Sequence, residues 1–167
     1  MPKDIKHFFF RQREAKRYLR EISQSLGIDA EKIFGSKPQI EIVETKRKKV
    51  YLIDRTPLFV VFEDVPLPTL FLKEYLSHLP QVTVDMGAVP YVCNGADVMA
   101  PGIVRVDGDF KKGELVVVVD ERNKQPIAIA QSIFDSEKIR IMKKGKVLRN
   151  LHYVGDVVWN LMKKGSS

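Results

Sequence analysis

Residues 84–103 read VDMGAVPYVCNGADVMAPGI, and this stretch decides the fold of the second half of the chain. A short strand is expected to lead into Gly87, and a two-turn helix is expected over Ala88–Cys93, with its proline tolerated in the first turn. Asn94-Gly95 then ends the helix, as glycine commonly does at this position. A second strand is expected to begin near Met99.

The residues around this stretch predict short strands separated by glycine corners. The expected strands are Val82–Val84, Leu115–Val119, Ile127–Ile133 and Lys146–Val154. Leu115–Val119 has no polar face, so burial on both sides is expected. Asp156–Lys164 is expected to form a closing helix, with Trp159 packed inward. Short strands at even spacing favour a small barrel.

Residues 1–80 predict a helix, a small antiparallel sheet and a second helix. Apolar residues recur at helical spacing over Arg11–Leu26, and Gly27 suits the position after that helix. A short helical turn is expected over Ala30–Phe34. The expected strands are Gln39–Glu44, Lys49–Asp54 and Leu58–Glu63. The second helix is expected over Thr69–Leu79, with Thr69 as its N-cap. The preceding residues Val65–Pro68 are expected to interrupt regular secondary structure.

The charge of the 167-residue chain is +7 and unevenly distributed. By residue type, residues 1–20 carry +5 and residues 137–167 carry +6, whereas residues 21–80 carry −1 and residues 81–136 carry −3. Clustered Lys and Arg are typical of proteins that bind polyanions. Solvation of the surface is the alternative explanation for such charge.

Several classes of protein are disfavoured by composition. The single cysteine, Cys93, cannot form an internal disulfide, which favours a reducing compartment and hence the cytoplasm. The longest apolar runs have five residues, so no membrane span and no secretory signal are expected. His and Cys residues lie far apart, phosphate-loop and dinucleotide motifs are missing, and no metal, cofactor or catalytic machinery is expected.

The second half of the chain resembles the PUA domain, a module shared by pseudouridine synthases and archaeosine transglycosylases. The resemblance covers residues 81–162 and implies a β-pseudobarrel, behind an N-terminal α+β domain at 1–80 and before a tail at 163–167. The motifs that carry it are Asp85-x-Gly87-Ala88, Gly95-Ala96-Asp97-Val98-x-x-Pro101-Gly102 and Leu151-His152-Tyr153-x-Gly155-Asp156-x-x-Trp159.

With Pro68-Thr69-Leu70 and the layout of residues 1–80, the whole chain is similar to the malignant T-cell amplified sequence proteins and to ligatin. These act in translation, the former with the density-regulated protein as partner. A second, density-regulated-like part is missing, which favours a stand-alone archaeal member. The resemblance implies RNA as a partner, and possible partners are the small ribosomal subunit and a translation factor, without a membrane.

The resemblance also implies which residues face RNA. On the first helix, its flanking loops and the second strand they are Gly87, Ala88, Asn94, Gly95, Ala96, Asp97, Met99, Pro101 and Gly102. Flanking the last strand they are Lys143, Lys144, Lys146, Arg149 and His152.

Physical reasoning supports these candidates. Gly95-Ala96 has almost no side chain, so a ribose-phosphate backbone can approach closely. Backbone N–H groups near Gly87-Ala88 are expected to receive phosphate oxygens. The alternative explanation for each glycine is a turn that requires positive φ, and the alternative for the lysines is a solvated surface.

Two further N-terminal features leave alternatives open. Phe8-Phe9-Phe10 is expected to place at least two rings in the core, although base stacking is an alternative. The basic stretch Lys46-Arg47-Lys48-Lys49 fits either a contact with ribosomal RNA or a solvated turn.

The leading hypothesis is a non-catalytic RNA-binding protein of translation that contacts tRNA or small-subunit ribosomal RNA. One alternative is a catalytic or accessory component of tRNA or rRNA modification. The size of the chain argues against it, since about 80 residues remain outside the PUA block and they show no catalytic pattern. The other alternative is an adaptor whose N-terminal sheet binds a partner protein.

Overall fold

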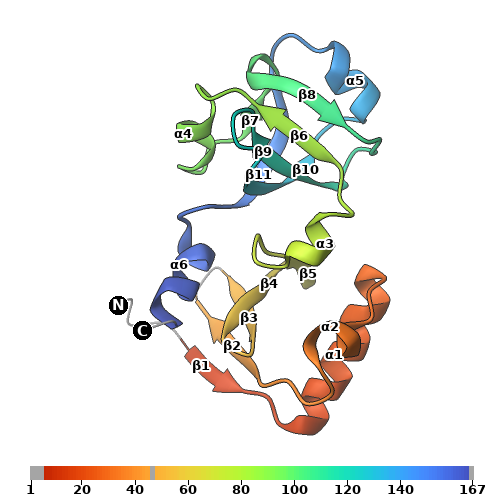
Figure 1. Ribbon diagram of the computed structural model, residues 1–167, viewed down its shortest axis with the longest axis vertical. Coiled ribbons are helices and arrows are strands. Elements are labelled where there is room, and N and C mark those ends of the chain that lie inside the picture. The colour runs from red at the N-terminus through yellow and green to blue at the C-terminus, as the bar shows by residue number, and fades with distance from the viewer. Residues whose placement is uncertain (1–5, 46–47, 166–167) are drawn as a thin grey trace. The chain divides into compact units, whose positions relative to one another are not determined.

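The computed structural model describes residues 6–45 and 48–165 of the chain. It has two compact units, Met1–Phe71 with Leu161–Ser167 and Leu72–Asn160 (Figure 1). Each unit has its own sheet and its own helices, and the expected α+β class is confirmed. Lys46 and Arg47, half of the basic stretch noted above, lie outside the described residues.

The first unit contains a five-stranded antiparallel sheet in the order β1-β2-β3-β4-β5. Its strands are β1 (Lys6–Phe9), β2 (Ile40–Glu44), β3 (Lys49–Ile53), β4 (Thr56–Phe62) and β5 (Val65–Pro68). Two-residue turns join β3 to β4 at Asp54-Arg55 and β4 to β5 at Glu63-Asp64. All four turn residues have positive φ, which matches the right-handed twist of a hairpin.

Helices α1 (Gln12–Leu26) and α2 (Ala30–Phe34) confirm the two helical segments expected near the N-terminus. Gly27 follows α1 in the left-handed conformation, with φ of 67°, and its N–H donates to the carbonyl of Ser23. Asp29 caps α2, because its side chain accepts the N–H of Lys32 at 3.1 Å. Ordinary capping chemistry therefore sets both ends of the α1–α2 connection.

Aromatic side chains join these helices to the sheet. Phe59 on β4 is fully buried and makes edge contacts with Tyr18 of α1 and Phe34 of α2. Tyr18 also meets Tyr51 of β3, with 4.3 Å between the ring centroids. Since Tyr51 and Phe59 are paired across the strands, both helices cover the same sheet face (Figure 1).

The prediction that at least two of the three N-terminal phenylalanines fill the core is wrong. Phe10 packs against Tyr18 and Tyr51, but Phe8 and Phe9 are exposed. The reason is that β1 is an edge strand, which pairs with β2 on one side only and leaves all of its residues exposed.

The expected helix over Thr69–Leu79 is largely wrong. The segment contains only the single turn α3 (Lys73–Leu76). Val65–Pro68, expected to interrupt regular secondary structure, forms strand β5. Thr69 is no helix cap, because it is fully buried and its hydroxyl donates to the carbonyl of Pro57 at 2.6 Å. A proline-containing strand fits here because β5 lies at the sheet edge.

The second unit is built on a six-stranded sheet in the order β7-β11-β10-β9-β6-β8. Its strands are β6 (Gln81–Val84), β7 (Val98–Met99), β8 (Ile103–Asp107), β9 (Leu115–Asp120), β10 (Pro126–Ser132) and β11 (Lys146–Tyr153). Side chains from all six strands share one apolar cluster, so the sheet is curled around it. Val116 to Val119 are all buried, which confirms the two-sided burial expected for that strand.

Short helices complete the second unit. Besides α3, they are α4 (Val89–Val92), the 3-10 turn η1 (Ala100–Gly102), α5 (Ser136–Ile141) and the start of α6 (Val157–Gly165), whose residues from Leu161 onwards belong to the first unit. The observed α4 is shorter than the expected two turns, and α5 was not expected from the sequence. Helix α6 starts one residue after the predicted closing helix, and Trp159 on it is half-buried, not packed fully inward.

Candidate nucleic-acid interface

Residues 94–97, here called the glycine loop, connect α4 to β7. Asn94, Gly95 and Ala96 are exposed, and Gly95 has φ of +94°. The loop is wound back onto α4, because the N–H of Gly95 donates to the carbonyl of Val92 and that of Ala96 donates to the carbonyl of Tyr91, both at 3.0 Å. A stretch of backbone with almost no side chain is therefore presented to solvent in a single conformation.

Asn150 on β11 holds the glycine loop in place. Its side-chain amide donates to the carbonyls of Val92 and Ala96, each at 3.0 Å. Its backbone N–H donates to the Asp97 carboxylate at 2.8 Å. Sequence reasoning missed Asn150, because nothing in the linear order links it to a loop more than 50 positions earlier.

Asp97 also pairs with a predicted site residue on β11. Its second carboxylate oxygen lies 2.8 Å from Nζ of Lys146, which stands opposite Met99 in the β7–β11 register. Partial burial alone would raise the pKa of Asp97, but the hydrogen bonds from Lys146 and from the Asn150 backbone outweigh it and lower the pKa. Asp97 is thus an ionised anchor that tethers Lys146 beside the loop.

Three more predicted cations lie around the same strand. Lys143 and Lys144 precede Gly145, whose φ is +95°, in the turn that enters β11, and Arg149 follows along the strand. All three are exposed, and none forms an ion pair with another residue that the structure describes. The carbonyl of Gly145 accepts the N–H of Ala100 at 2.8 Å, which places this lysine turn against the segment after β7.

The predicted RNA-facing residues Ala88 and Gly102 have structural roles in this fold. The N–H of Ala88 donates to the Asp85 side chain at 2.8 Å, so it is not the phosphate-binding donor that was expected. A Cβ on Gly102 would lie 3.2 Å from that of Ala88, and close packing therefore accounts for this glycine. Gly87 and Pro101 are exposed, Ala88 and Gly102 partly so.

The assignment of His152 to the RNA-facing set is wrong. Its side chain is 1% exposed, and its Nδ1 lies 2.7 Å from an Asp156 carboxylate oxygen. Asp156 also accepts the backbone N–H groups of Tyr153 and Trp159, at 3.0 and 2.8 Å. His152 lies in the interior beside buried Leu151, where the β10–β11 register shifts, and through Asp156 it joins the strand to the start of α6.

Tyr91 is a surface residue that the sequence analysis did not select. It lies on α4 directly before the glycine loop and is 71% exposed. A large exposed aromatic that borders a bare loop provides a stacking surface for a base. Sequence reasoning missed Tyr91, because only the structure shows that α4 is a short helix that buries Val92 and leaves Tyr91 exposed.

The described residues offer neither a metal site nor a membrane-spanning helix. Within residues 6–45 and 48–165, no group of three or more His, Cys, Asp or Glu side chains could hold a metal ion. In the same ranges, no helix is both long enough and apolar enough to cross a membrane.

Comparisons with known proteins cover nearly the whole chain. Residues 80–154 match the family model of the PUA domain, and residues 6–75 match that of a domain of unknown function, DUF1947. The solved structure of hypothetical protein PH0734.1 from Pyrococcus horikoshii is 30% identical, with a TM-score of 0.73 over 94% of this chain and 99% of that one.

Three curated relatives also match over most of this chain and most of their own length. Protein MJ1432 of Methanocaldococcus jannaschii is 37% identical over 93% of this chain and 96% of its own. Translation machinery-associated protein 20 of Saccharomyces cerevisiae is 30% identical over 78% of this chain and 76% of its own. A malignant T-cell-amplified sequence 1 homolog from Dictyostelium discoideum also matches, at 29% identity over 77% of this chain and 75% of its own. The resemblance seen in the sequence is thus confirmed, and the chain belongs to the PUA-domain family that includes translation machinery-associated protein 20 and the malignant T-cell-amplified sequence proteins.

Proposed function

We propose that this protein binds RNA through the glycine loop and the cations of β11, and that it serves translation by holding tRNA or small-subunit ribosomal RNA without catalysing a reaction. One observation carries the proposal. A loop of bare backbone, pinned by Asn150 and Asp97, lies beside the exposed and unpaired cations Lys143, Lys144 and Arg149 of the described surface.

The physical chemistry of this face suits a nucleic-acid strand. A loop without side chains lets a sugar-phosphate backbone approach the peptide groups, and the nearby cations neutralise its charge. Since Lys146 is already paired with Asp97, three cations are free for phosphates in this part of the surface. With about 0.7 counterions released per single-strand contact, the slope of log affinity against log salt is expected to be about −2.

The relatives support the proposed role in translation. Translation machinery-associated protein 20 is named for translation. The residues of the proposed face all lie within the segment 80–154 that matches the PUA family model. Translation takes place in the cytoplasm of cells, which is the compartment that this proposal implies. The factor would act by positioning RNA, and a partner such as the small ribosomal subunit would receive it.

Two lysine turns of the second unit allow a matched test. Lys143-Lys144-Gly145 adjoins the proposed face, and Lys111-Lys112-Gly113 has the same sequence pattern and a glycine of similar φ on the β8–β9 connection. The double reversal K143E/K144E is expected to weaken the binding of a tRNA transcript at least tenfold, whereas K111E/K112E changes it less than threefold. Fluorescence anisotropy at several salt concentrations gives both values. Equal losses in the two variants would mean that the attraction is diffuse and the proposed face is wrong.

The alternatives make different predictions for simple assays. A modification enzyme would change the mass or nucleoside content of a tRNA after incubation with the protein, and a binding factor leaves it unchanged. An adaptor would retain its protein partner in the K143E/K144E variant, since its binding would not depend on these lysines. RNA affinity and partner retention are therefore measured on the same preparations.

A further inference from the structure

We infer that the cleft between α1 and α2 in the first unit is a second RNA contact, which takes the sugar-phosphate backbone of a strand. The inference rests on the proposed function only in taking RNA as the ligand, because the cleft is made entirely of residues 16–37. It assigns a binding role to the part of the chain that matches the domain of unknown function.

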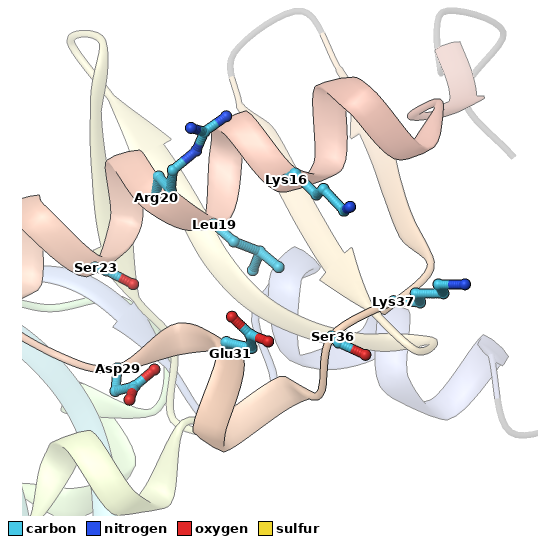
Figure 2. Close-up of a pocket in the computed structure, with 8 residues that line it drawn as sticks. All are labelled: Lys16, Leu19, Arg20, Ser23, Asp29, Glu31, Ser36 and Lys37. Carbon is cyan, nitrogen blue, oxygen red and sulfur yellow. The ribbon is translucent and has the colours of Figure 1, made fainter.

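The cleft has a volume of about 520 Å³, and apart from Leu19 the residues that line it are charged or polar. Lys16, Leu19 and Arg20 of α1 line one side of the cleft, and Glu31 and Ser36 line the opposite side, which α2 and the turn after it supply. Figure 2 shows Leu19 and Glu31 between the helices, and the Arg20 guanidinium on the side of α1 away from α2. Leu19 is buried and points between the helices, so it forms an apolar floor.

Three cations surround the cleft without a partner in the described part of the chain. Lys16 and Arg20 are one helical turn apart on α1, and Lys37 follows α2. None of the three is in an ion pair with a described residue, and all are exposed. Against the two carboxylates of the cleft, Asp29 and Glu31, the three cations leave an excess of one positive charge, which attracts phosphates.

The positive surface continues along α1 beyond the cleft. Arg13 and Arg17 are exposed on the same helix, and with Lys16 and Arg20 they recur at spacings of one, three and four residues. From Arg13 to Arg20 the helix rises by about 10 Å, at 1.5 Å per residue. A nucleic-acid strand in a duplex presents a phosphate about every 3.4 Å along its axis, so this face spans about three phosphates.

The acidic residues of the cleft favour RNA over other polyanions. Asp29 is committed to the α2 backbone, since it accepts the N–H of Lys32. Glu31 has no ion-pair partner among the described residues, and its carboxylate is directed towards α1 (Figure 2). This carboxylate repels every anionic partner, RNA phosphates included, but the 2′-hydroxyl of a ribose, which DNA lacks, can donate to it and offset that repulsion. Cations for phosphates and an acceptor for a hydroxyl are the combination that RNA requires.

The first test compares two exposed lysines of the same unit. Lys16 lines the cleft, and Lys32 lies on α2 but does not line it. K16E is expected to weaken the binding of tRNA or of a small-subunit rRNA fragment about three- to tenfold, R20E by a similar factor, and K32E by less than twofold. Circular dichroism and urea unfolding verify that each variant is folded. Equal effects of K16E and K32E would overturn the inference, and so would a loss confined to binding of anionic vesicles.

A second test separates this contact from the glycine-loop face. In the K143E/K144E background, K16E is expected to weaken the remaining RNA binding by the same factor as in the wild type. If K143E/K144E has no effect of its own while K16E does, the proposed face fails and the cleft stands; the opposite result removes the cleft alone.

A third test addresses the sugar. Glu31→Ala removes a negative charge and is expected to strengthen binding of both RNA and DNA of one sequence, while lowering the RNA-to-DNA affinity ratio at least twofold. An unchanged ratio would show that Glu31 meets no 2′-hydroxyl and would overturn the assignment to RNA.

Discussion

Gly95 lies directly against the ring of Tyr153: a Cβ built on this glycine would be 3.2 Å from the Tyr153 hydroxyl oxygen and 3.3 Å from its ring carbon Cε1. Its φ of +94° adds a second constraint, because residues with a side chain rarely adopt that conformation. Both the turn and the close approach therefore require glycine here, and the approach is to the protein's own β11.

Gly95→Ala is expected to lower the free energy of unfolding by about 2 kcal/mol, from backbone strain together with the contact on Tyr153. Gly113→Ala is the matched control, since Gly113 has φ of +92° and nothing within 4 Å of a built Cβ. That variant should lose only about 1 kcal/mol, the cost of the backbone alone. Urea denaturation of both variants measures the difference in the free energy of unfolding. Equal losses would show that the Tyr153 ring moves aside with no loss of stability.

Asn150→Ala is expected to lower the free energy of unfolding by about 1–3 kcal/mol, because it removes the side-chain donor to the carbonyl of Ala96 and one of the two donors to the carbonyl of Val92. Hydrogen exchange of the Gly95 and Ala96 amides should accelerate, and RNA affinity should fall as the loop loses its single conformation. Asn150→Asp should be worse than Asn150→Ala at pH 7, since a carboxylate would face two carbonyl oxygens. Unchanged amide exchange in both variants would contradict the role of Asn150 as the anchor of the loop.

Asp156 predicts a dependence of stability on pH. Burial by itself would raise the pKa of Asp156, but hydrogen bonds from His152 and from two backbone N–H groups outweigh it and hold the pKa below the ordinary 3.8. A carboxyl with a lowered pKa in the folded state stabilises the fold above its unfolded pKa, and this contribution disappears as the pH falls through the folded pKa.

Asp156→Asn should therefore be less stable than the wild type at pH 7, by about 1–3 kcal/mol. The difference should narrow steadily below about pH 4, where the wild-type carboxylate becomes protonated. Urea unfolding of both proteins at pH 7, 5 and 3 gives the comparison. A difference that is the same at all three pH values would mean that the charge of Asp156 does not contribute.

The aromatic residues of the first unit provide a test of core and surface. Phe59 is fully buried between Tyr18 and Phe34, so Phe59→Ala is expected to cost about 3–5 kcal/mol of stability. Phe9 is 53% exposed on the edge strand, and Phe9→Ala should cost less than about 0.5 kcal/mol. Thermal unfolding separates the two. A large loss from Phe9→Ala would show that β1 is covered in solution.

Periodicity predicted the long, regular elements well. Helix α1 and strands β9, β10 and β11 were expected within two residues of their observed ends, because apolar spacing and glycine positions report directly on these segments. The helix over Thr69–Leu79 was not formed as expected, since Thr69 hydrogen-bonds to β4 instead of capping a helix. Local spacing carries no information on such long-range partners.

For the candidate site, the sequence by itself determined the bare loop, the lysine turn and the family to which they belong, because glycine patterns and charge clusters are local properties of the chain. Only the tertiary structure decided that Asn150 and Asp97 tie that loop to β11, that His152 faces inward to Asp156, and that α1 and α2 enclose a charged cleft. The contacts of Asn150 form only after segments more than 50 residues apart have come together, and the direction in which His152 faces and the way α2 folds back on α1 are set by packing, so local sequence patterns do not report them.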